Sequence, residues 1–383
     1  MNETVDVIRD TAELTLSPRT ESRGAAQRSG EVGCLVFREN NFDLIRLLAA
    51  MQVVFLHGWG HLGLPTEGTQ WLLHAVGMFP GVPIFFVVSG FLISASFERS
   101  PSTWEYLRNR FLRIYPALWV CFLVSLVTVA IFSDARTSWR SFTVWTFGQL
   151  TIGQFYNPDF LRGYGVGVLN GSLWTVTVEL QFYLLLPFLY LAFQRIGWNR
   201  VCVGLCFLLF VGISQYYAWL ADWGEESIGV KLLGVTALPH FYLFFGGVLL
   251  QRHRGFVARA LKGQVLYWCL GYLFLGITLR AIGLPVAGNR LNPLSALFLG
   301  FVVISCAYTY ADRLGRLLNG LDISYGVYLY HMVVFNVLVS VGAIRSFSMF
   351  AVGIAATVLL GLLSWVFVEK PALSCKAYSV KRQ

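Results

Sequence analysis

An arginine and a histidine in one apolar segment, FDLIRLLAAMQVVFLHGWG, are the residues whose types and spacing best suit chemistry. Arg46 and His57 are eleven positions apart. At about 100° per residue this spacing is roughly 20° past three full turns, so both lie on one helix face, about 16 Å apart along the axis. Histidine exchanges a proton near neutral pH. The alternative interpretation is an arginine that extends to the lipid headgroups and a histidine at the far interface.

A second group of candidates follows the next apolar segment, in RSPSTWEYLRNRFLRIYP. It contains Arg108, Arg110 and Arg113, and the last two are one helical turn apart. Two guanidinium groups at that spacing can hold a phosphate through paired hydrogen bonds. Ordinary positive charge at the cytoplasmic end of a membrane span explains the same residues equally simply.

A third group lies in NGSLWTVTVELQFYLLLP, where Glu179 and Gln181 interrupt an apolar run and Tyr183 follows Glu179 by four residues on the same face. A carboxylate in such a place needs a partner or a proton. Glu179 could orient a histidine, bind a hydroxyl group or accept a proton. The structural alternative is a buried ion pair, for which Arg46 is a candidate.

The fourth group is ISYGVYLYHMVVF, in which Ser324 and His331 stand among tyrosines at a helix start. Ser324 is suited to cap the helix, and the tyrosines fit an aromatic belt at the membrane interface. His331 is a candidate for contact with an acceptor or for a structural role. No metal site is expected, because neither the seven cysteines nor His61 and His74 have ligand spacing.

These residues must be positioned by membrane helices. The 383 residues are 56% hydrophobic and only 13% charged, about half the charged share of a soluble domain. We predict an all-α polytopic membrane protein of about ten transmembrane helices, since about 20 apolar residues cross a bilayer. The stretch 141–156 is expected to be interfacial or re-entrant. The predicted spans are 42–60, 78–97, 111–132, 172–193, 199–219, 231–250, 265–283, 292–311, 323–343 and 348–368.

Basic residues predict the orientation. With both termini inside, the internal cytoplasmic loops hold twelve Lys and Arg residues and the outer loops hold seven, as the positive-inside rule requires. We therefore expect a cytoplasmic disordered tail at 1–41, a transmembrane domain at 42–371 and a cytoplasmic C-terminal tail at 372–383. The net charge of +9 is explained by these loops, so no nucleic-acid partner is expected, and the location is a cell membrane, the inner one if the protein is bacterial.

The same segments, in this order, resemble the acyltransferase-3 family of integral membrane O-acyltransferases. Leu180 stands where many relatives carry a second glutamate, and the absence of an esterase-like domain after Pro371 resembles the stand-alone members, which act on exopolysaccharides and related glycans. The resemblance covers about residues 42–371. The matching motifs are FDLIR through His57, GVPIFFVVSGFLI from Gly81, the Arg110–Arg113 segment with IYP, SLWTVTVELQFYLLLP from Ser172, ISYGVYLYH and VEKP.

The resemblance implies an O-acetyltransferase with acetyl-CoA as its donor substrate, no tightly bound cofactor, and a carbohydrate hydroxyl as acceptor. It implies that His57 and Arg46 are essential and that Arg110 and Arg113 bind the donor, with Arg108 beside them. His57 would act as general base or carry the acyl group, and Glu179 would orient His57 or pair with Arg46. A transporter or flippase of a glycan or lipid intermediate is the alternative, because polar residues at depth also suit a pathway.

Overall fold

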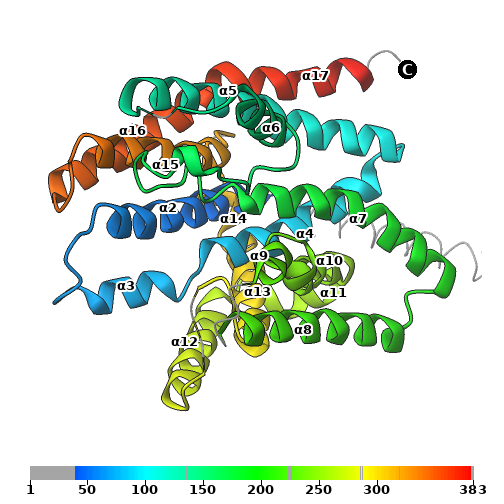
Figure 1. Ribbon diagram of the computed structural model, residues 1–383. Helices are drawn as coiled ribbons and strands as arrows, with labels where there is room; N and C mark the ends of the chain where they lie inside the picture. Colours follow the sequence, from blue (N-terminus) through cyan, green and yellow to red (C-terminus); the bar gives the residue numbers. More distant parts are fainter. Residues whose placement is uncertain are drawn as a thin grey trace, which may run out of the picture. The chain divides into compact units, whose positions relative to one another are not determined.

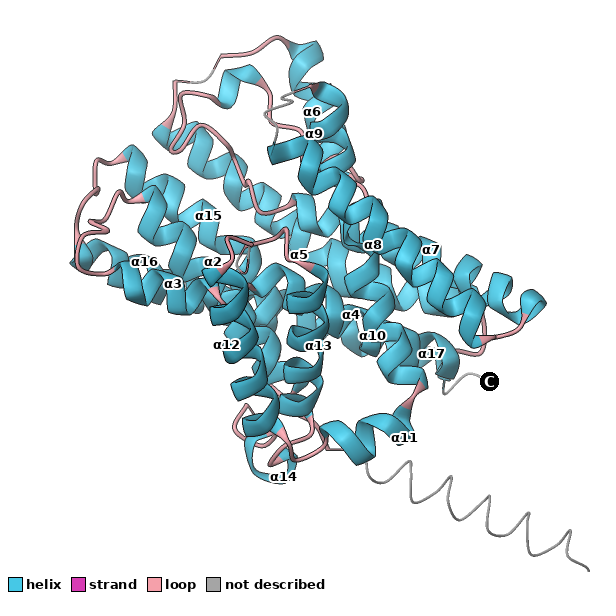
Figure 2. Ribbon diagram, turned by 90° about the horizontal axis from the view of Figure 1, so that it is seen from below, coloured by secondary structure: helices cyan, strands magenta, loops and turns pink. Residues whose placement is uncertain are grey.

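The structure is built from helices, which satisfy backbone hydrogen bonds internally, as a chain in lipid must. A computed structural model describes residues 39–380, apart from 135, 223–226, 285, 287, 319 and the side chains of 376–380. These described residues contain no strand and lie almost entirely in one unit, Asn40–Gln383 (Figures 1 and 2). The predicted tail 1–41 lies outside the described residues up to 38, and part of the predicted tail 372–383 belongs to helix α17 (Lys370–Val380).

The bounds of the elements are as follows. The longer helices are α2 (Phe42–His61), α4 (Gly81–Arg99), α5 (Thr103–Phe132), α7 (Trp174–Ile196), α8 (Arg200–Asp222), α10 (Phe241–Arg252), α12 (Val265–Ala281), α13 (Pro293–Ala307), α15 (Ser324–Ser340) and α16 (Phe347–Ser364). The shorter ones are α3 (Gln70–Gly77), α6 (Trp139–Leu150), η1 (Asp159–Leu161), α9 (Ile228–Gly234), η2 (Leu238–His240), α11 (Arg254–Phe256), α14 (Ala311–Leu314) and the π turns η3 (Val257–Leu261) and η4 (Trp365–Glu369).

Each of the ten predicted spans coincides with a helix, but fewer than ten are long enough to cross a membrane. Among the described residues six helices have that length and composition, and up to eight if each of two bent pairs is one span. The pairs are α9 with η2 and α10, bent by 49°, and α11 and η3 with α12, bent by 85°. Helices α13 and α15 are apolar but have only 15 and 17 residues. The polytopic all-α class is thus supported, and the count of ten and the orientation remain predictions.

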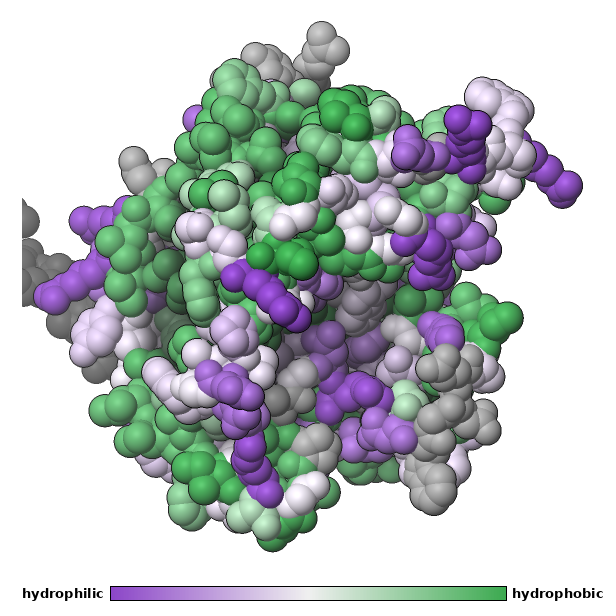
Figure 3. All heavy atoms as spheres, turned by 60° about the vertical axis from the view of Figure 1, so that its left-hand side comes forward, coloured by the Kyte–Doolittle hydropathy of each residue, from purple (hydrophilic) through white to green (hydrophobic). Residues whose placement is uncertain are grey.

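Helices α4 and α8 differ in how much of their surface is buried within the protein. The apolar window of the α3–α4 segment is 61% buried, whereas that of α8 is 11% buried. In a membrane protein an apolar exposed helix face contacts lipid, so α8 lies at the periphery and α4 at the centre. Figure 3 shows mainly hydrophobic sides, with hydrophilic residues gathered in a hollow on the face where α2 ends.

Two glycines let α4 and α10 approach closely. A Cβ atom at Gly90 would lie 1.9 Å from the carbonyl oxygen of Phe244, and one at Gly247 would lie 2.2 Å from that of Val87. Small residues at such crossings are a common packing device of membrane helices. The contact fixes the height of α4, and with it Ser89, which neighbours Gly90.

The long loop before α7 folds onto α15. The loop's own core joins Trp145 of α6 to Phe122, Leu161, Tyr164 and Leu169. Buried Asn336 of α15 accepts from the Val166 amide at 2.9 Å and donates to the Leu169 carbonyl at 2.8 Å. The predicted interfacial stretch 141–156 therefore forms α6 and a turn within a loop that is anchored to the helix bundle.

Candidate functional site

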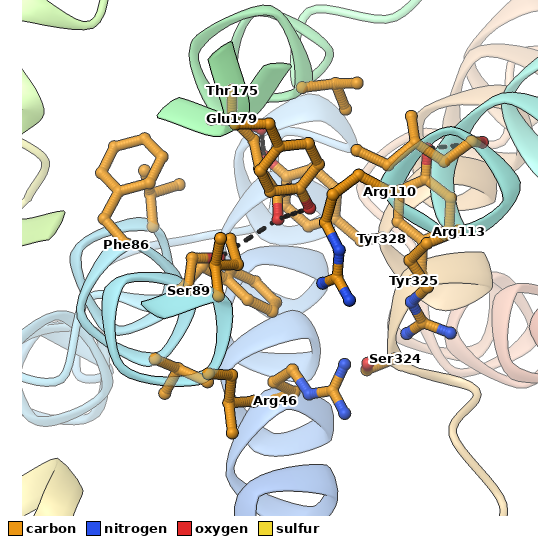
Figure 4. A pocket seen from close by; sticks show the side chains of 18 residues that line it. Arg46, Phe86, Ser89, Arg110, Arg113, Thr175, Glu179, Ser324, Tyr325 and Tyr328 are labelled. Atoms are coloured by element: carbon orange, nitrogen blue, oxygen red, sulfur yellow. Dashed lines mark hydrogen bonds between the residues drawn. The ribbon is translucent and has the colours of Figure 1, made fainter. Parts of the chain in front are cut away.

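Three predicted arginines line one cavity of about 100 Å³ between α2, α4, α5, α7 and α15. Arg46 comes from α2, and Arg110 and Arg113 from α5. Their guanidinium groups lie on one side of the cavity, and Glu179 of α7 lies on another (Figure 4). Tyr183 and Ser324 also line this cavity, so the fold brings together, from four helices, six of the residues singled out in the sequence.

Arg46 and Arg113 share one carboxylate, that of Asp322, which precedes α15. The Nη1 atom of Arg46 is 3.1 Å and the Nη2 atom of Arg113 is 2.5 Å from Oδ2 of Asp322. Arg46 also pairs with Asp43 one turn earlier in α2. The Asp322 side chain is only 10% exposed, so these charges are held largely out of water and stabilise one another.

Burial by itself would raise the pKa of the Asp322 carboxyl. The guanidinium groups of Arg113 and Arg46 outweigh this effect, helped by a hydrogen bond from Ser324, and hold the pKa of Asp322 below its usual value. Asp322 is therefore ionised at neutral pH. It draws α2, α5 and the start of α15 together.

Glu369 adds a second carboxylate to Arg113. Its Oε2 atom is 3.6 Å from Nη1 of Arg113, and its side chain is 1% exposed. Glu369 ends the π turn η4, in which the Lys370 amide donates to the Trp365 carbonyl, five residues back. Such turns frequently occur at functional sites. With Asp322 and Glu369 as partners, the charge of Arg113 is compensated within the protein.

Arg110 differs from Arg46 and Arg113 in its interaction partners. It donates to the Ser96 hydroxyl at 3.2 Å and lies 5.8 Å from the ring centre of Tyr183. Among the described residues it forms no ion pair, and its buried Nε atom has no hydrogen-bond partner. Because Arg46 and Arg113 have carboxylate partners, Arg110 is the cavity arginine without an ion pair among the described residues, although the Glu179 carboxylate lines the same cavity. An anion entering the cavity would be attracted chiefly to Arg110.

Glu179 accepts hydrogen bonds from two hydroxyl groups. Ser89 of α4 donates at 3.1 Å, and Tyr183, one turn further along α7 as its spacing indicates, donates at 2.5 Å. The sequence suggested that Glu179 pairs with Arg46 or orients His57; within the described chain of this structure it makes neither contact. The reason is that Asp322 occupies the Arg46 guanidinium, and His57 lies about three turns further along α2.

His57 contacts a second histidine instead. Its Nδ1 atom lies 3.0 Å from Nε2 of His331, whose own Nδ1 atom lies 2.7 Å from the Tyr328 carbonyl oxygen. His331 is fully buried, and His57 is half-buried. Arg46 and His57 thus both face the segment from Asp322 to His331, as their predicted common helix face requires.

Tyr328 lies between the cavity and the histidine pair. It lines the cavity together with Phe85, whose ring centre is 5.5 Å from its own, and the Tyr328 ring is 5.7 Å from that of His331. The Tyr328 hydroxyl is held by Thr175 at 2.8 Å. A substrate that reached from one site to the other would have to pass the Tyr328 ring.

Three predicted residues lie elsewhere or act differently. Arg108 reaches the Cys375 carbonyl at the surface, 3.3 Å away, and does not line the cavity. Gln181 binds the Val235 carbonyl and the Ala237 amide, so it holds the bend between α9 and η2. Ser324 does not cap α15; it donates to Asp322 at 2.8 Å.

Sequence reasoning missed the acidic partners. Asp322 directly precedes the ISYG segment and Glu369 belongs to VEKP, both noted as motifs. A single carboxylate at the end of a predicted span looks like ordinary interface polarity. The number of arginines at one end of the bundle was a usable signal, because buried arginines need carboxylate partners nearby.

Comparisons with known proteins identify a family and several relatives. Residues 39–368 match the family model described as Acyltransferase domain. Nodulation protein 10 of Rhizobium leguminosarum bv. viciae is 35% identical over 364 residues, which cover 90% of this chain and 96% of that protein. The O-acetyl transferase of Shigella phage Sf6 is 25% identical, with 88% and 97% covered, and the exopolysaccharide production protein ExoZ of Rhizobium meliloti is 26% identical, with 76% and 89% covered.

No solved structure matches the chain. The family match covers most of the sequence, including both the arginine cavity and the histidine pair. Nodulation protein 10 and the phage O-acetyl transferase are matched over 96% and 97% of their own length. The chain belongs to the acyltransferase family of membrane proteins.

Proposed function

We propose that this protein transfers an acetyl group from acetyl-CoA, bound from the cytoplasmic side, to a hydroxyl group of a carbohydrate in a bacterial cell membrane. The observation that carries the proposal is the guanidinium of Arg110, which has no ion pair among the described residues, in a cavity of three arginines that is also lined by α2 and α15, the helices of the His57–His331 pair. The names of the relatives, an O-acetyl transferase and a protein of exopolysaccharide production, support the reaction and the class of acceptor.

The distance between the two sites fits the donor. Arg46 and His57 are eleven residues apart on α2, which is about 16 Å at 1.5 Å per residue. The arm of coenzyme A has roughly 13 bonds from phosphate to sulfur, and at about 1.2 Å per bond of an extended chain it spans roughly 16 Å. Because Arg46 and Arg110 line the same cavity, phosphates held there would place the thioester near His57.

The chemistry then follows from the residues present. The acceptor oxygen attacks the thioester carbonyl, His57 takes the hydroxyl proton, the carbon–sulfur bond breaks, and the sulfur leaves as the thiol after receiving that proton. Arg110 binds the donor through charge-assisted hydrogen bonds. Tyr328 must move for the arm to pass, because its ring lines the cavity and also neighbours His331.

The test uses membranes that contain the wild-type protein or His57→Ala, supplied with acetyl-labelled CoA and a glycan fraction. We expect label in an alkali-labile ester, together with free CoA, only with the wild type. Transport of a glycan without release of CoA would instead establish the transporter alternative. Ester formation that persists in His57→Ala would remove His57 from the reaction.

A further inference from the structure

The hydrogen bonds of His331 determine where its hydrogen lies. Its Nδ1 atom is 2.7 Å from the Tyr328 carbonyl oxygen. A carbonyl oxygen only accepts, so Nδ1 of His331 must carry a hydrogen. A neutral imidazole has one N–H group, and its other nitrogen then has a free lone pair. The Nε2 atom of a neutral His331 is therefore an acceptor.

The same donor–acceptor argument applies to His57. Its Nδ1 atom is 3.0 Å from Nε2 of His331. Because that atom accepts, Nδ1 of His57 must donate, and a neutral His57 then carries its lone pair on Nε2. Within the part of the chain that the structure describes, Nε2 of His57 has no hydrogen-bond partner. The lone pair is thus left available for a substrate proton.

The surroundings favour neutral rings. The titratable groups that face the pair are His61, with its ring centre 5.4 Å from that of His57, and Tyr328, 5.7 Å from His331. Among the described residues no carboxylate pairs with any of these histidines. A buried cation without an acidic partner is costly, and His331 is fully buried.

We infer that His331 is a positioning residue, which fixes His57 in the tautomer whose Nε2 takes the proton of the acceptor hydroxyl. This inference rests on the proposed function. When Nε2 of His57 takes the proton, its Nδ1–H group still donates to His331. The neutral acceptor thereby stabilises the imidazolium without receiving a proton itself.

Three substitutions at one position separate this role from packing. In His331→Gln the side-chain amide lies about where Nε2 lay and can accept from His57. In His331→Asn the side-chain amide lies about where Nδ1 of His331 lay, so it can restore only the hydrogen bond to the Tyr328 carbonyl oxygen. His331→Leu removes the hydrogen bonds to both His57 and Tyr328. All three are compared with the wild type for transfer rate, for KM of donor and acceptor, and for thermal unfolding in detergent.

We expect kcat to fall by about 100-fold, the lower range of a general base's contribution, in His331→Asn and His331→Leu. His331→Gln should stay within about tenfold of the wild type, and the KM values should change little. Equal rates for the Gln and Asn variants, whether both high or both low, would overturn the inference. So would a change confined to KM.

A measurement on the unmodified protein covers variants that do not fold. Nitrogen NMR of histidine-labelled wild-type protein in bilayers should show a hydrogen on Nδ1 of both His57 and His331. A hydrogen on Nε2 of His331 would contradict the inference. An inactive wild type with the expected tautomers would mean that the proposed function fails while the hydrogen-bond assignment stands.

Discussion

The arginine cavity and the histidine pair share helices α2 and α15, with α4, α5 and α7 completing the cavity, yet they differ in charge. At the cavity, two of the three guanidinium groups, those of Arg46 and Arg113, pair with the carboxylates of Asp322 and Glu369. At the pair, two imidazoles bond to each other and to a backbone carbonyl. The difference indicates that the two regions have different roles. Fixed positive charges are suited to bind an anion, and a neutral imidazole is suited to accept a proton.

The largest effect is expected from His57→Ala. Loss of a general base lowers the rate by about 10²–10⁴-fold. Donor binding should persist, because we assign it to the arginine cavity and not to the histidine pair. Transfer rate and donor affinity are measured on the same membranes. His61→Ala is the matched control, because His61 lies next to His57 without bonding to His331. A similar loss in both variants would erase the distinction between the two regions.

Asp322→Asn should destabilise the protein most. It leaves Arg46 and Arg113 without their shared carboxylate in a site where the side chains are 10–21% exposed, and breaking such a pair costs about 3–5 kcal/mol. Thermal unfolding in detergent measures the change. Asp222→Asn, from the exposed pair with Arg290, is the control, for which about 0–1 kcal/mol is expected. Equal effects would show that the cavity charges are not structural.

Arg110→Ala should act on the donor alone. A charged hydrogen bond contributes about 1.5–3 kcal/mol, so the donor KM should rise by roughly 10–100-fold with unchanged stability, since Arg110 has no ion pair in the described chain. Arg108→Ala, at the surface beside Cys375, should leave that KM unchanged. A rise with Arg108→Ala and none with Arg110→Ala would move the donor site out of the cavity.

The smallest effect is expected in the pH dependence of thermal stability. Since the pKa of Asp322 is lowered in the folded protein, its stabilising contribution is complete above the usual aspartate value of about 3.9 and is lost as the pH falls through the lower folded value. The difference in unfolding temperature between the wild type and Asp322→Asn should therefore shrink below about pH 4. A difference that stays constant down to pH 3 would assign the effect of the variant to something other than charge.

Hydropathy predicted where the helices are, because each long apolar run must bury its backbone polar groups in a helix. It did not predict their lengths. Helix α15 ends at Ser340, and the long loop before α7 packs against its last turns through Asn336. The bends of 49° and 85° also depend on contacts, such as those of Gln181 with the α9–η2 turn, that no window of one segment contains.

At the site, spacing within one helix predicted well and pairing between helices did not. The common face of Arg46 and His57 and the Glu179–Tyr183 contact follow from the helical repeat. The partners of these residues come from chain segments far away in sequence. Asp322 instead of Glu179 binds Arg46 because the start of α15 lies against α2, a proximity that only the fold provides.

The π turn at Trp365–Glu369 makes the site sensitive to insertions and deletions. It holds one more residue than an α turn would, and its last residue, Glu369, faces Arg113. Deleting one residue inside this turn would leave a regular α turn with Glu369 in nearly the same direction, because the π turn absorbs the extra residue. Deleting one residue from the regular part of α16 would instead turn the carboxylate by about 100°, although every side chain of the pair remained in the sequence. In this segment the number of residues matters as much as their identity.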